Sequence, residues 1–197
     1  MTLDAYRGRM GRILNPMALA LYRHGVSANQ LSVLSLFFAV VAGVAFYAQL
    51  LWLAVVAIAC NALCDALDGC LARSSSGASL RGDLIDHVID RYSDVFILGG
   101  ITLGGYVAWQ IGLLAIIGVL LTSYLGTQAQ ALGVGRDYRG LLGRADRLVL
   151  IFFVSAFSLV FPENIVWFPL LGWMMVFIAF ASNFTALQRF YATYRRL

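Results

Sequence analysis

The sequence predicts an all-α, polytopic membrane protein with six transmembrane helices and an amphipathic helix at its N-terminus. The first reason is composition, because 61% of the 197 residues are apolar and 12% are charged, whereas a soluble domain carries about 25% charged residues. The second is length, since the chain accommodates roughly six apolar stretches of about 20 residues. These properties exclude a cytosolic enzyme, a coiled coil and a secreted disulfide scaffold.

Residues 1–24 are predicted to form an amphipathic helix that lies in the membrane interface. Their apolar residues recur at helical intervals, and four arginines lie opposite: Arg7, Arg9, Arg12 and Arg23. The apolar stretch is too interrupted for a signal peptide. We expect Gly25 to end this helix and residues 25–197 to form the six-helix transmembrane domain that carries any catalytic site.

The six transmembrane helices are expected where long apolar stretches lie between turn signals. The turn signals are Ser74–Gly77, Gly104–Gly105, Gly133–Gly143 and Pro162–Asn164. The predicted spans are 31–50, 51–72, 83–105, 109–133, 146–161 and 165–188.

The arginines indicate the topology. All 14 basic residues are arginine, and 13 of them fall in the N-terminal segment, the second-to-third loop, the fourth-to-fifth loop or the C-terminus. The loops near residues 50, 106 and 163 carry none. The positive-inside rule then places both termini on the cytoplasmic side of the cell membrane. Arg91, inside the third span, is the exception.

Six of the ten acidic residues lie between Asp65 and Asp94. Asp65 and Asp68 are three residues apart, and Asp86 and Asp90 are four apart, so each pair shares one helix face. Asp83 and Asp94 extend the second set. Because the intervening loop is short, we expect two antiparallel neighbouring helices whose carboxylates converge near the cytoplasmic mouth of the bundle.

Four carboxylates at membrane depth need compensating positive charge. One or two divalent cations would supply it, and an all-oxygen site favours Mg²⁺ or Mn²⁺. Gly69 and Gly82 allow a bulky ligand to approach the backbone, and Arg73 is placed to bind a phosphate. This combination indicates phosphoryl transfer or hydrolysis. The alternatives are structural ion pairs with Arg73, Arg81 and Arg91, or a divalent-cation transport pathway.

The acidic segment resembles the signature of the CDP-alcohol phosphotransferase family, D-x2-D-G-x2-A-R-x8-G-x3-D-x3-D. The matching residues are Asp65, Asp68, Gly69, Ala72, Arg73, Gly82, Asp86 and Asp90. The resemblance implies transfer of a phosphatidyl-type group from a CDP-linked lipid to an alcohol, with release of CMP. It further implies a two-metal site, a homodimer within the lipid bilayer and no nucleic-acid partner.

The resemblance also implies roles for individual residues. Asp65, Asp68 and Asp86 would be the principal metal ligands, and Asp90 the general base, itself contacting a metal. The CDP pocket would comprise Asp68, Gly69, Ala72, Arg73 and Gly82, with Asn29 in the segment before the first span, where the family commonly has Pro-Asn and this chain has Ala28-Asn29.

Positively charged side chains outside the signature indicate which acceptor is used. A phosphorylated acceptor needs such side chains to bind its phosphate, and we expect Arg139, Arg144 and Arg147 to supply them. The run from Ser123 to Gln130, followed by Gly143–Arg147, resembles the inositol-phosphate branch of the family and its archaeal relatives. That branch has Lys, Arg and Glu where this chain has Gly126, Gln128 and Gln130. Glycerol phosphate, or an unphosphorylated alcohol such as serine, is therefore the alternative acceptor.

A second glycine pair, Gly100 and Gly104, lies on the third span. Its small-xxx-small spacing is typical of close helix packing, so we interpret it as a possible dimer seam. Cys60, Cys64 and Cys70 are expected to act as small apolar side chains. His87, next to Asp86, should point away from the carboxylate cluster.

Overall fold

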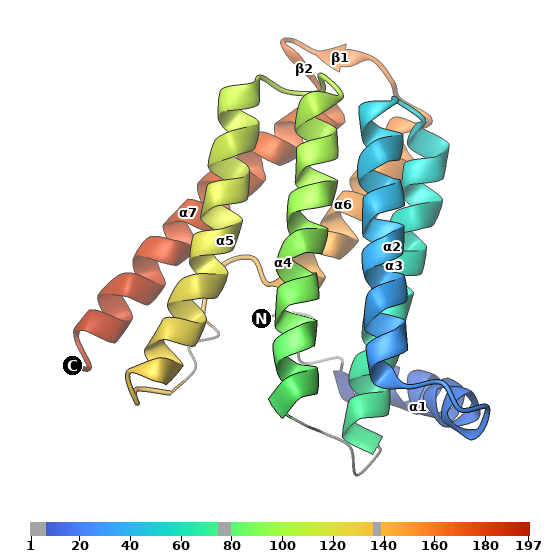
Figure 1. Ribbon diagram of the computed structural model, residues 1–197. Coiled ribbons are helices and arrows are strands. Elements are labelled where there is room, and N and C mark those ends of the chain that lie inside the picture. The colour runs from blue at the N-terminus through green and yellow to red at the C-terminus, as the bar shows by residue number, and fades with distance from the viewer. Residues whose placement is uncertain (1–6, 75–79, 136–138) are drawn as a thin grey trace.

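The computed structural model describes residues 7–74, 80–135 and 139–197, and in these segments it is almost entirely helical (Figure 1). Arg136 and most of the predicted Ser74–Gly77 turn lie outside the described residues. A two-stranded antiparallel hairpin precedes the last helix. The elements are α1 (Arg7–Arg23), α2 (Ala28–Tyr47), α3 (Leu51–Ser74), α4 (Leu80–Leu103), α5 (Trp109–Ala131), α6 (Arg144–Ser158), β1 (Asn164–Ile165), β2 (Phe168–Pro169) and α7 (Leu170–Tyr194).

A helix occupies each predicted span. Among the described residues, four helices are long and apolar enough to cross a membrane: α2, α3, α5 and α7. α6 has only 15 residues, and α4 carries several ionised side chains. The chain is therefore a multi-pass membrane protein by composition, and the arginine-rich segments gather at one end of the bundle (Figure 1).

The start of the last helix differs from the prediction. We expected helix from residue 165, but residues 164–169 form the hairpin and α7 begins at Leu170. Val166 takes a left-handed conformation with φ of 64°, which a helix does not allow. Trp173 stabilises the turn, because its Nε1 donates a hydrogen bond to the Ile165 carbonyl over 2.9 Å.

α2 packs closely against both α3 and α4. A Cβ atom at Gly100 would overlap the backbone of Gly43, and one at Gly104 would overlap the Phe46 carbonyl. The glycines of α4 therefore let α2 and α4 approach backbone to backbone within one chain. Our interpretation of Gly100 and Gly104 as a dimer seam was wrong, because both glycines pack against α2 of the same chain. The small-xxx-small spacing indicates close helix packing but does not indicate which helix is the partner.

α3 and α4 meet at their carboxylate ends, as expected, but they are not packed along their length. They run antiparallel, but α2 packs along both, and α3 and α4 make little backbone contact with each other (Figure 1). The short connection constrains only one end of the pair. Small residues on α2, including Ala39 and Ala42, are fully buried and allow this helix to pack against both.

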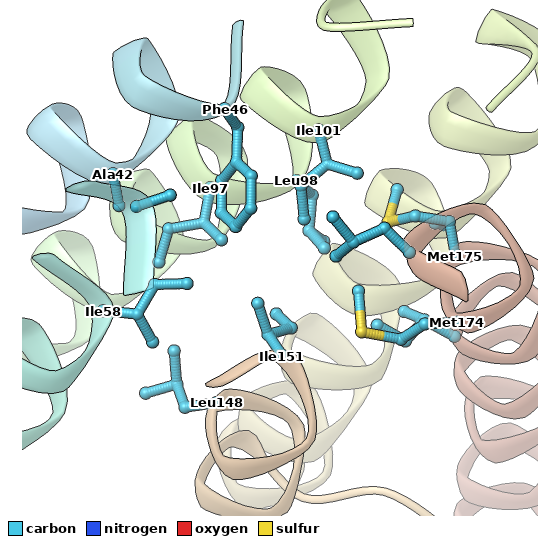
Figure 2. Packing of buried hydrophobic residues seen from close by; sticks show 14 of the residues in the cluster. Ala42, Phe46, Ile58, Ile97, Leu98, Ile101, Leu148, Ile151, Met174 and Met175 are labelled. Atoms are coloured by element: carbon cyan, nitrogen blue, oxygen red, sulfur yellow. The ribbon is translucent and has the colours of Figure 1, made fainter. Parts of the chain in front are cut away.

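The apolar core fills the end of the bundle opposite the arginines. It joins side chains from α2, α3, α4, α6 and α7 (Figure 2). The core residues Phe46, Ile58, Ile97, Ile101 and Met175 are at most 1% exposed. Toward the C-terminal end of α3 and the N-terminal end of α4, the buried carboxylates Asp68, Asp90 and Asp94 lie near a smaller apolar cluster that joins α1, α2 and α3. The main core therefore holds together the ends of the helices that lie opposite the arginines, and the buried aspartates and arginines lie at the other end.

Candidate active site

Three carboxylates converge where the lower halves of α3 and α4 face each other. Asp65, Asp68 and Asp86 each offer an oxygen within 4.8 Å of the others. Asp68 is 5% exposed, whereas Asp65 and Asp86 are half-buried, so the cluster is partly open to solvent. Three close carboxylate oxygens repel one another unless a cation lies between them. The donor set is all oxygen, which fits Mg²⁺ or Mn²⁺.

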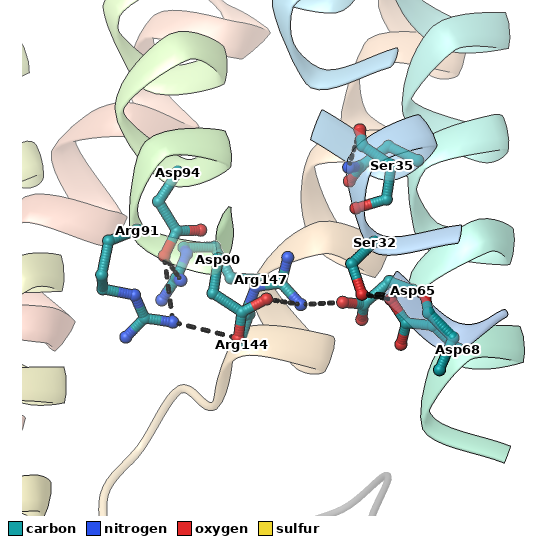
Figure 3. A network of polar contacts seen from close by, with 11 residues as sticks. Ser32, Ser35, Asp65, Asp68, Asp90, Arg91, Asp94, Arg144 and Arg147 are labelled. Carbon is teal, nitrogen blue, oxygen red and sulfur yellow. Dashed lines mark hydrogen bonds and ion pairs between the residues drawn. The ribbon is translucent and has the colours of Figure 1, made fainter. Parts of the chain in front are cut away.

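Asp90 joins this cluster through an arginine of α6. Arg144 Nη1 donates a hydrogen bond to Asp65 Oδ1 and lies 2.9 Å from Asp90 Oδ1 (Figure 3). Asp90 also forms a possible ligand group with Asp86 and His87. His87 therefore does not point fully away from the carboxylates as expected, although its Nε2 also lies 3.6 Å from Asp83 Oδ1.

A second ion pair lies beside the first. Arg147 Nη2 is 2.7 Å from Asp94 Oδ2, and both side chains are almost completely buried. Arg91 Nη2 is 3.4 Å from Asp90 Oδ2 and 3.7 Å from Asp94 Oδ2. Arg91, the arginine that breaks the topology pattern, therefore belongs to this network (Figure 3).

Several guanidinium nitrogens in this network are buried without a hydrogen-bond acceptor among the described residues. They are the Nε atoms of Arg91, Arg144 and Arg147, and Nη2 of Arg144. Leaving such a donor unpaired is costly, so an anionic ligand with several oxygens would satisfy them. Five carboxylates (Asp65, Asp68, Asp86, Asp90 and Asp94) face three arginines, so the network keeps an excess of negative charge that a divalent cation would balance.

Ser32 was not identified from the sequence. Its hydroxyl, on the second turn of α2, donates to Asp68 Oδ2 over 2.9 Å and lies 3.2 Å from the Ala28 carbonyl. The hydrogen bond orients one carboxylate of the cluster. A serine facing an aspartate 36 positions away leaves no local signal, because the contact depends on how α2 packs against α3.

The predicted CDP-binding residues lie on the turns of α2, α3 and α4 next to the carboxylates. Gly69 follows Asp68 directly, and a Cβ there would lie 3.2 Å from Arg73 Nη1. Arg73 is exposed, with Nη2 3.4 Å from Cys70 Sγ. Gly82 lies in the first turn of α4, one turn before Asp86, and Asn29 lies in the first turn of α2, one turn before Ser32. Ala72 is half-buried on α3.

The three predicted acceptor arginines have different settings. Arg144 and Arg147 reach the carboxylates, although each uses part of its guanidinium in ion pairs. Arg139 is an exposed residue, and its carbonyl accepts a hydrogen bond from Arg189 Nε over 2.7 Å. Arg189 Nη1 also donates to the Thr122 carbonyl over 2.7 Å. The structure thus brings Arg144 and Arg147 to the site, whereas the backbone carbonyl of Arg139 contacts Arg189 on α7.

Buried carboxylates suited to a divalent cation, lined by arginines with free donors, define an enzyme that acts on phosphate esters at a membrane. The chain belongs to the CDP-alcohol phosphatidyltransferase family, whose model matches residues 25–187. The signature aspartates all lie within the matched range.

The chain is similar over nearly its whole length to named synthases. The archaetidylinositol phosphate synthase of Pyrococcus horikoshii is 33% identical over 195 residues, covering 99% of this chain and 98% of the relative. The phosphatidylinositol phosphate synthase of Mycobacteroides abscessus is 30% identical, covering 94% and 86%. The chain is a transferase of this family.

Solved structures agree with this fold. The phosphatidylinositol phosphate synthase of Mycobacterium tuberculosis with CDP-DAG bound has a TM-score of 0.79 at 26% identity, covering 93% of this chain and 94% of that chain. The same enzyme in complex with manganese and citrate has a TM-score of 0.78 at 26% identity, covering 92% and 88%. A manganese complex in a protein of this fold agrees with the oxygen-rich donor set described above.

Proposed function

We propose that this chain transfers the lipid phosphate group of a CDP-linked lipid to inositol phosphate, with release of CMP. The observation that carries the proposal is the position of Arg144 and Arg147, which form ion pairs with Asp90 and Asp94. Both arginines also have buried N–H groups that lack an acceptor among the described residues. These donors suit the phosphate of an acceptor. The names of the full-length relatives support inositol phosphate over glycerol phosphate and serine.

The carboxylates divide into two roles. Asp65, Asp68 and Asp86 would hold Mg²⁺ or Mn²⁺, which when bound neutralises the diphosphate and stabilises the leaving CMP. Asp90, one turn after Asp86, would take the proton from the acceptor hydroxyl and also lie against the metal. Its contact with Arg144 supports this role, because the arginine would hold the acceptor phosphate close to the base.

The bonds change as follows. The acceptor hydroxyl oxygen attacks the phosphorus on the lipid side of the diphosphate, and its proton passes to the Asp90 carboxylate. The bond from that phosphorus to the bridging oxygen breaks, and the bridging oxygen leaves with CMP. Gly69, Ala72, Arg73, Gly82 and Asn29 would bind the CDP portion, with Asp68 shared between the donor and the metal.

We place this site on the cytoplasmic side of the cell membrane. The support is the arginine distribution: the segments that carry arginine lie at the end of the bundle that contains the site, whereas the opposite loops carry none. In this arrangement α2 to α7 are six spans and α1 lies in the interface, with both termini cytoplasmic. The predicted homodimer would use a surface other than the Gly100 and Gly104 seam.

The test is CMP release by the purified protein in lipid nanodiscs with Mg²⁺ and either a diacyl or an ether-linked CDP-lipid. The acceptors are inositol 1-phosphate, glycerol phosphate, serine and free inositol, the last being the matched control that lacks only the phosphate. We expect turnover with inositol 1-phosphate and none with free inositol. Turnover with serine or free inositol would contradict the phosphate-binding role of Arg144 and Arg147. Turnover with glycerol phosphate alone would identify glycerol phosphate as the acceptor in place of inositol phosphate.

A further inference from the structure

The segment that leads into α6 is attached to α7. Thr185, on α7, is completely buried. Its Oγ1 accepts a hydrogen bond from the Leu141 backbone N–H over 3.1 Å and donates to the Ala181 carbonyl over 2.7 Å. One hydroxyl therefore uses both its donor and its acceptor capacity. It links α7 to a chain segment outside regular structure.

Two further contacts hold the same segment. Gly140 has φ of 144°, and a Cβ there would overlap the Thr185 methyl group. The methyl therefore occupies the space that the glycine leaves. One turn along α7, Arg189 Nε donates to the Arg139 carbonyl over 2.7 Å. Residues 139–141 are thus held against α7 by one side-chain packing contact and two hydrogen bonds to backbone.

This attachment lies next to the arginine that bridges Asp65 and Asp90. Leu142 is buried in the core, Gly143 caps α6, and Arg144 is its first residue. Only two residues separate the Leu141 amide from Arg144, so the chain allows little independent movement between them. A shift of the 139–143 segment moves the start of α6, and with it the guanidinium that lies between Asp65 and Asp90.

We propose that Thr185 is a positioning residue for the acceptor side of the active site, an inference that rests on the proposed function. Through the Leu141 amide it sets where α6 begins, and so where the Arg144 and Arg147 guanidinium groups meet the acceptor phosphate. Thr185 touches no reacting group. Its contribution is to hold the acceptor-binding groups in place before the acceptor arrives.

The experiment compares Thr185→Val, which keeps the side-chain shape and removes the hydroxyl, with Thr185→Ser, which keeps the hydroxyl. Thr102→Val is the control, because Thr102 also donates to a carbonyl four residues earlier and packs against a glycine, Gly112, but at the opposite end of the bundle. The readouts are the KM for each substrate, kcat, and hydrogen exchange of residues 139–143 measured by mass spectrometry.

We expect Thr185→Val to raise the KM for inositol phosphate roughly fivefold or more, the scale of one lost hydrogen bond. The KM for the CDP-lipid should not change, and the 139–143 segment should exchange faster. Thr185→Ser should restore most of the affinity, and Thr102→Val should match the wild type. Such a split between the two substrates would not follow from a general loss of stability.

Three results would overturn the inference: an unchanged acceptor KM in Thr185→Val, unchanged exchange of residues 139–143, or equal defects in the Val and Ser variants. Failure of the proposed function looks different, because the wild-type protein itself would then not use inositol phosphate. In that case the KM is measured for the acceptor that is used. A normal KM for that acceptor in Thr185→Val would again reject the positioning role.

Discussion

Adding one methyl group to α4 should have opposite effects at two adjacent glycines. At Gly99 a Cβ would meet nothing within 4 Å, whereas at Gly100 it would overlap the Gly43 backbone. Both positions lie inside the same helix, so Gly99→Ala and Gly100→Ala gain the same helix propensity. They differ only in whether α2 must move away from α4.

The magnitude follows from these two contributions. Replacing glycine by alanine within a helix stabilises it by about 1 kcal/mol, which Gly99→Ala should show in full. Overpacking costs about 1–3 kcal/mol, and the upper value applies at Gly100 because backbone atoms cannot rotate aside. The two variants should therefore differ by about 3 kcal/mol in free energy of unfolding, or about 6–12 °C in Tm for a chain of this size.

Both variants are purified in the same detergent, and thermal unfolding, CMP release and oligomeric state by light scattering are measured together. Gly100→Ala should have the lower Tm and the lower activity, since α4 carries Asp86 and Asp90, while its oligomeric state stays that of the wild type. Equal Tm values would refute the close contact between α2 and α4. A change of oligomeric state without a change in Tm would mean that Gly100 and Gly104 contact a second protomer.

Three further substitutions test the polar network. Asp90→Asn should abolish CMP release and leave CDP-lipid binding intact, and residual turnover would remove Asp90 from the role of base. Asp94→Asn leaves Arg147 buried without its partner and should lower stability by about 3–5 kcal/mol in thermal unfolding; a wild-type Tm would contradict the buried pair. Ser32→Ala removes the hydrogen bond to Asp68 and should weaken Mg²⁺ binding by about tenfold, measured as a shifted Mg²⁺ dependence of Tm. In that variant, an unshifted Mg²⁺ dependence would mean that Ser32 does not orient the carboxylate.

The parts of the fold that depend on local pattern could be predicted from the sequence. Hydropathy and turn residues located the helices to within a few residues, apart from the 164–169 hairpin. Helical periodicity grouped Asp65 with Asp68, and Asp86 with Asp90. Both are local properties, because residues three or four apart on a helix lie on one face whatever surrounds them.

The contacts between distant segments could not be predicted in the same way. Arg144 was expected to face a phosphate, and the pairing of its guanidinium with Asp65, 79 residues earlier, depends on where α6 begins. Gly100 was recognised as a site of close approach but assigned to the wrong partner. In both cases the residue type indicated the kind of contact, while the packing of α2 and α6 determined which group it meets.

The charged face of α4 has a consequence for how the protein is made. α4 carries Asp86, Asp90, Arg91 and Asp94, and each ionised side chain at the centre of a lone helix costs about 2.5–3.5 kcal/mol to insert into a bilayer. As a membrane span, α4 would therefore depend on its neighbours to offset this cost.

The partners on α6 that offset this cost are synthesised later. Arg147 follows Asp94 by 53 residues, so this partner becomes available only after α5 and the start of α6 have been synthesised. Arg91 offsets part of the cost within α4 itself, and the guanidinium groups of α6 offset the rest. Stable insertion of α4 and formation of the ion pairs at the active site should therefore depend on each other, so Asp94→Asn is expected to lower the yield of folded protein as well as its stability.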